Sequence, residues 1–140
     1  MNFMAHVNHS HHDVALMLAM MHVIIRDGLH DAAWVAAHTH GFDELRDHVA
    51  DATPEWAAEV CGLDASVIET LARDYATTRP AAIRTLIGAE HHEHGGMFFR
   101  TLACLPALVG SWAERGGGFA RSAGAWTGQG IDDDALTGAH

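Results

Sequence analysis

The chain has 140 residues, in which 18 acidic side chains outnumber 8 basic ones and give a formal charge of −10 with neutral histidines. This acidic balance argues against a nucleic-acid partner, because binding to a phosphate backbone requires concentrated positive charge. The length allows one domain with a substantial core, and 49% hydrophobic against 19% charged residues is typical of a globular protein. The longest apolar run, residues 14–25, is shorter than the roughly 20 residues of a transmembrane helix, so no such segment is expected.

The N-terminal part of the chain predicts a polar arm followed by helices. Residues 1–12, MNFMAHVNHSHH, follow neither a helical nor a strand period, so we expect a loose arm. Asp13 is a good N-cap for a helix that is apolar on nearly every face until Gly28 ends it. Two short helices are predicted next, over residues 32–38 and 42–49.

The middle of the chain carries two further helix signatures. Residues 53–55, Thr-Pro-Glu, combine a capping threonine, a proline suited to the first turn and an acid at the positive end of the helix dipole. They predict a helix over residues 54–61. Asp64 caps the following helix, in which apolar residues recur at helical spacing until Thr-Arg-Pro at 78–80 ends it.

A change of period then marks a strand. Residues 81–87 are short, carry β-branched side chains and lie between a proline and a glycine, which predicts the one clear strand. A loop rich in glycine and histidine, residues 88–96, leads into a long apolar helix over residues 97–112. The remaining residues, 119–140, predict an irregular tail.

These elements define a helix-rich α/β fold with about six helices and a partial Rossmann-like layer. Because a single strand cannot form a sheet, we expect it to pair with strands outside this chain, so that the domain is incomplete. We therefore interpret the chain as a His-rich arm (1–12), part of an α/β domain (13–118) and a tail (119–140).

The clearest functional pattern is the strand, loop and helix over residues 81–112. Glycines in such a loop let the backbone approach a ligand closely, and free N–H groups at the helix start bind a phosphate or the polar edge of a cofactor. A plain connection explains the same pattern, since neither GxGxxG nor GxxxxGK[ST] is present.

Four segments in order give the chain a family resemblance. They are DVALMLAMMHVIIRDGLHDAAWVAAHTHGFDEL (13–45), TPEWAAEVCGLDASVIETLARDYATTRPAAIR (53–84), GAEHHEHGG (88–96) and RTLACLPALVGSWAERGGG (100–118). Together, over about three quarters of the chain, they resemble the middle α/β region of the molybdopterin-dependent oxidoreductases. That family includes formate dehydrogenases, nitrate reductases and dimethyl sulfoxide reductase.

The resemblance implies cofactor-binding residues. In the family an aspartate before the first helix meets the guanine end of a molybdopterin guanine dinucleotide, and Asp13 occupies that place, although a role as N-cap alone stays open. The family loop G-x-x-x-H-x-N-G-G lies against the cofactor. Gly88, His92, Gly95 and Gly96 match it, whereas a histidine replaces the asparagine; a purely structural role for His92 stays open.

The resemblance also implies parts that lie outside the chain. The cofactor would carry molybdenum or tungsten, and an iron–sulfur cluster of the parent enzyme would be held elsewhere, because four cysteine ligands are needed and the chain has two. We expect no catalytic residue and no metal ligand here, and therefore an inactive chain unless the missing remainder or a companion chain supplies the rest. The two cysteines in helices, and a start that does not look like a signal peptide, predict a cytoplasmic location.

Two alternatives belong to other classes of protein. One is a small helical binding or scaffold module, whose apolar helices would bury one another and leave no large apolar patch. The other is a His-rich metal- or pH-responsive protein, suggested by 13 histidines. The tryptophans and the methionines of residues 17–21 are interpreted as core or packing residues.

Overall fold

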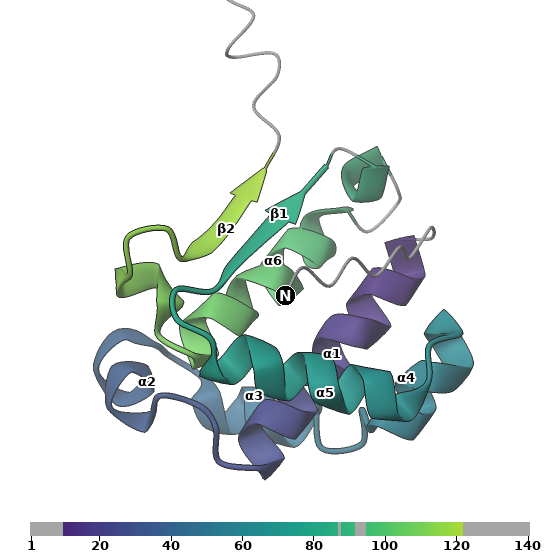
Figure 1. Ribbon diagram of the computed structural model, residues 1–140, viewed down its shortest axis with the longest axis horizontal. Coiled ribbons are helices and arrows are strands. Elements are labelled where there is room, and N and C mark those ends of the chain that lie inside the picture. The colour runs from purple at the N-terminus through teal and green to yellow at the C-terminus, as the bar shows by residue number, and fades with distance from the viewer. Residues whose placement is uncertain (1–9, 87, 92–94, 122–140) are drawn as a thin grey trace, which may run out of the picture.

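A computed structural model describes residues 10–86, 88–91 and 95–121 (Figure 1). Within these ranges the chain forms helices and a two-stranded sheet, which confirms the helix-rich α/β class. In chain order the elements are α1 (Ser10–Arg26), α2 (Ala32–His38), α3 (Phe42–His48), α4 (Pro54–Cys61), α5 (Ala65–Thr77), β1 (Ala82–Thr85), the 3₁₀ helix η1 (Gly88–His91), α6 (Gly95–Leu108), the 3₁₀ helix η2 (Ser111–Ala113) and β2 (Gly118–Arg121).

Helix α1 forms the centre of the molecule, as its all-round apolar sequence predicts. Met21, Val23 and Ile24 are completely buried. The helix begins at Ser10, so the prediction that Asp13 is its N-cap is wrong, and Asp13 lies in the first turn instead. Three residues of the predicted arm, 10–12, therefore belong to the helix. Gly28 ends α1 as predicted, with a φ of +66° that favours glycine.

The short helices are capped largely as the sequence predicts. The Asp31 carboxylate accepts a hydrogen bond of 2.9 Å from the Trp34 N–H at the start of α2. The Thr53 hydroxyl accepts one of 3.2 Å from the Trp56 N–H at the start of α4. These contacts satisfy backbone donors that the first helical turn leaves without partners.

The core has one main cluster, in which α1 packs against α6. Phe98, Leu102 and Leu105 of α6 are buried in this cluster together with the methionines of α1. On the opposite side α1 packs on α4 and α5, where Ala19, Ala57 and Ile68 form a second small cluster. The two longest apolar helices therefore bury much of their surface against one another.

The sheet contains a strand that the sequence does not predict. β1 pairs in parallel with β2, with Ala82 opposite Gly118 and Thr85 opposite Arg121. Residues 119–121, expected to be irregular, thus belong to a strand. α6 covers one face of the sheet (Figure 1). The rings of Phe119 in β2 and Phe99 in α6 lie 6.3 Å apart, centroid to centroid.

Some predicted packing residues are more exposed than expected. Trp56 is 40% exposed and Trp112 is 46% exposed, although Trp112 still makes an edge contact with Phe119. Cys61 and Cys104 are half-buried free thiols. The methionines at positions 17, 20 and 21 are buried, as predicted. None of the helices in the described part of the chain is long and apolar enough to cross a membrane.

Candidate functional site

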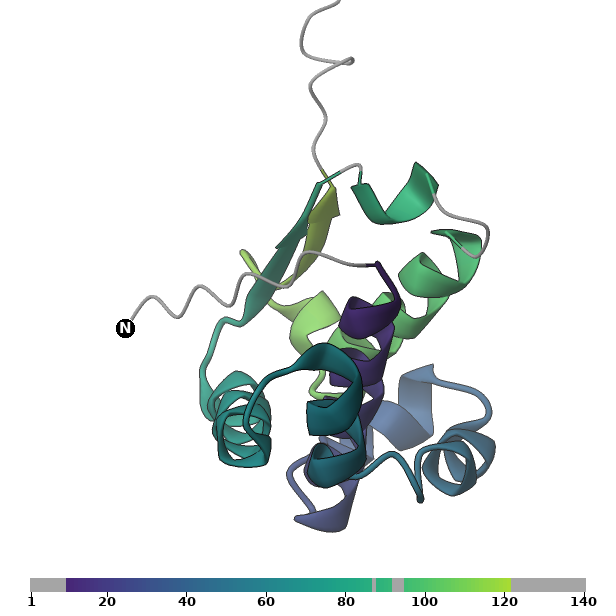
Figure 2. The same cartoon turned by 90° about the vertical axis from the view of Figure 1, so that its right-hand side faces the viewer.

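Several of the predicted site segments meet at one end of the molecule, which we call the strand end. It comprises the carboxyl ends of β1 and β2, the 3₁₀ helix η1, and the first turns of α1 and α6. Figures 1 and 2 show these parts together from two directions. In open α/β sheets ligands bind beyond the carboxyl ends of the strands, so the topology favours a binding site here.

Asp13 lies in the first turn of α1 and is half-buried. Burial raises the pKa of its carboxyl group, and the nearby His12 opposes this rise. The carboxylate accepts no hydrogen bond from any side chain or backbone group in the described ranges. A partly desolvated acceptor of this kind is suited to N–H donors of a ligand.

Gly88 and Gly96 leave open space beside the backbone. Within the described part of the chain, a Cβ atom added at either position would meet no atom within 4 Å. Neither glycine has a positive φ, so neither backbone conformation requires glycine. The described residues therefore leave space beside these two glycines that a ligand could approach closely.

The start of α6 supplies backbone donors to the same end. Gly95 begins the helix and is buried, and Gly96 follows it on the exposed side. The first N–H groups of an α-helix have no partners within the helix and carry the positive end of its dipole. The strand end therefore combines a carboxylate acceptor with backbone donors.

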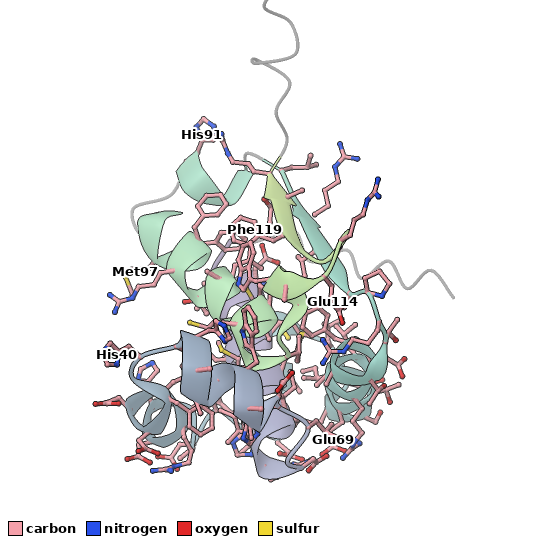
Figure 3. All side chains as sticks on the ribbon, turned by 90° about the vertical axis from the view of Figure 1, so that its left-hand side faces the viewer. His40, Glu69, His91, Met97, Glu114 and Phe119 are labelled. Carbon is pink, nitrogen blue, oxygen red and sulfur yellow. The ribbon has the colours of Figure 1, made fainter. Side chains whose placement is uncertain are left out.

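The histidines of the predicted binding loop lie outside the described residues or directly beside them. His92 lies outside the described residues, as do its neighbours at 93 and 94. His91 ends η1 and is exposed, and Figure 3 shows its ring directed away from the body of the molecule. No cluster of three metal-ligating side chains occurs in the ranges 10–86, 88–91 and 95–121.

Two further polar residues of the strand end, Thr85 and Arg121, are not predicted as site residues from the sequence. Thr85, the last residue of β1, is 8% exposed, and its buried hydroxyl has no hydrogen-bond partner in the described part of the molecule. Arg121 is its register partner at the end of β2 and brings a cation to the same edge. A hydroxyl inside the predicted strand 81–87 is a weak signal for Thr85, whereas Arg121 belongs to a strand that the sequence does not predict.

A parallel sheet, a glycine-bearing connection and a helix start form the arrangement of a cofactor-binding α/β layer. No protein-family model matches the chain. Individual relatives do match it. The chain is 43% identical over 106 residues to the probable oxidoreductase YoaE of Bacillus subtilis, covering 76% of this chain and 16% of the relative. It is 40% identical over 99 residues to formate dehydrogenase H of Escherichia coli, covering 71% and 14%.

A solved structure agrees with these relatives. Acetylene hydratase from Pelobacter acetylenicus superposes with a TM-score of 0.66 at 34% identity, over 71% of this chain and 14% of that protein. Over the matched three quarters, the chain is homologous to the molybdopterin oxidoreductases. It spans only 14–16% of the length of the curated relatives that it matches.

Proposed function

We propose that the strand end binds one arm of a molybdopterin guanine dinucleotide, as part of a two-electron redox enzyme. The observation that supports this proposal is that the 3₁₀ helix η1 and the first turns of α1 and α6 lie at the end of the sheet where the two parallel strands end (Figures 1 and 2); these three elements carry Gly88, Asp13 and Gly96, respectively. These residues come from separate segments of the chain, and each matches a position that the family resemblance assigns to the cofactor.

The residues present fit such a group. The Asp13 carboxylate would accept hydrogen bonds from guanine N–H groups. Backbone at Gly88, Gly95 and Gly96 would contact the pterin or the phosphates, because no side chain keeps the ligand at a distance at Gly88 or Gly96. Thr85 would donate its hydroxyl, which has no partner among the described residues, and Arg121 would help to neutralise phosphate charge.

This chain would bind and orient the cofactor without reacting itself. When bound, the cofactor supplies molybdenum or tungsten as the centre of a two-electron oxidation or reduction. An iron–sulfur relay, the reacting ligand of the metal and a substrate pocket would come from further polypeptide, either the rest of a longer protein or a companion chain. A cytoplasmic location belongs to the same proposal.

The test is to purify the chain gently from a strain that makes molybdopterin guanine dinucleotide, and to measure bound pterin by mass spectrometry and absorbance. We expect near-stoichiometric pterin in the wild type and a loss of about tenfold in Asp13→Asn, which removes a charged acceptor. Asp51→Asn changes an exposed aspartate in a turn and is the matched control.

Two outcomes would refute the proposal. One is a folded chain, with its helical circular dichroism intact, that carries no pterin even when the cofactor is supplied in excess. The other is equal retention of pterin by Asp13→Asn, Asp51→Asn and wild type, which would place the cofactor elsewhere.

A further inference from the structure

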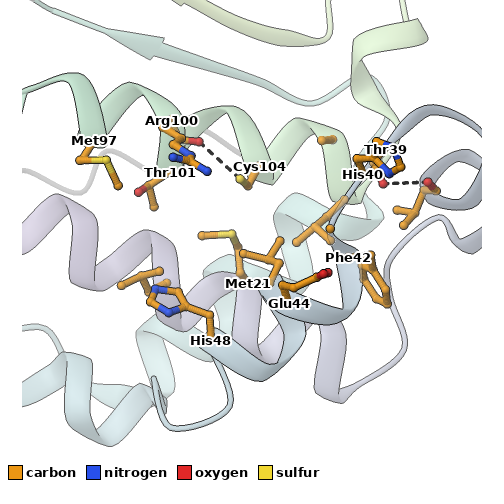
Figure 4. A pocket seen from close by; sticks show the side chains of 16 residues that line it. Met21, Thr39, His40, Phe42, Glu44, His48, Met97, Arg100, Thr101 and Cys104 are labelled. Carbon is orange, nitrogen blue, oxygen red and sulfur yellow. Dashed lines mark hydrogen bonds between the residues drawn. The ribbon is translucent and has the colours of Figure 1, made fainter.

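We draw no further inference here: the strongest candidate, the apolar groove between α3 and α6 (Figure 4), carries none, because nothing in the structure shows what covers it.

Discussion

The helical half of the molecule and its strand end differ in how completely they satisfy their own groups. Around α1, α4 and α5, apolar side chains such as Ile24 and Ile68 are fully buried, and the Thr53 side chain caps the start of α4. At the strand end, Thr85 buries a hydroxyl without a partner in the described part, and Leu86 is 65% exposed. Parallel sheets are normally covered on both faces, and among the described residues α6 covers one face of this sheet (Figure 1).

This difference separates a region that its own packing completes from the region that we propose binds a ligand. Groups that a fold leaves unsatisfied reduce stability, so they persist where a ligand or partner completes them.

The largest effect is expected in the helical half. Ile24→Ala removes a completely buried side chain from α1 and should lower the free energy of unfolding by about 2–5 kcal/mol. Leu86→Ala, at an exposed residue directly after β1, is the matched control and should change the free energy of unfolding by less than about 0.5 kcal/mol. Urea titration followed by circular dichroism measures both. Similar losses for the two variants would erase the contrast.

Gly96→Ala should have opposite effects on stability and binding. Alanine has a higher helix propensity than glycine, and its Cβ meets no described atom, so the free energy of unfolding should rise by up to about 1 kcal/mol. Bound pterin should fall, because the methyl group occupies the space that we assign to the cofactor. Thermal unfolding and pterin content are measured on the same preparation; an increase in both would separate Gly96 from the cofactor.

Asp13→Asn should stabilise the chain in a pH-dependent way. Burial raises the pKa of Asp13 in the folded state, so its contribution to stability is greatest below the unfolded pKa and is lost as pH rises through the folded pKa. Replacing the carboxylate by a neutral amide should therefore raise the melting temperature at pH 7 and have less effect near pH 3. A constant difference across this range would show that the charge of Asp13 is not destabilising.

The smallest effect is expected on the exposed surface. Arg73 pairs with Glu69 and Asp27 and thereby links α5 to the end of α1, and hydrogen bonds from Arg73 and Arg26 lower the pKa of Glu69. Glu69→Gln should lower the melting temperature slightly at pH 7, with the difference disappearing as pH falls through that lowered pKa. Added salt should also reduce it. A large loss that salt does not change would mean that this pair supports the core.

Local sequence signals predicted most helices and one strand correctly. Asp31, Thr53 and Gly28 act on groups only a few residues away, so their capping roles can be read from short segments. The burial of Met17, Met20 and Met21 follows from a helix that is apolar on nearly every face. The glycine positions of the candidate site also came from the sequence, through resemblance to a family loop.

Tertiary structure alone decided the remaining features. β2 begins in a glycine-rich segment of low strand propensity and forms because β1 lies beside it, with a crossover through α6 between them. The register that places Arg121 beside Thr85 follows from that pairing. A groove between α3 and α6 is likewise lined by residues more than 50 positions apart in the sequence, such as Leu45 and Thr101. Contacts between distant segments depend on how whole helices and strands pack, which propensities along the chain do not specify.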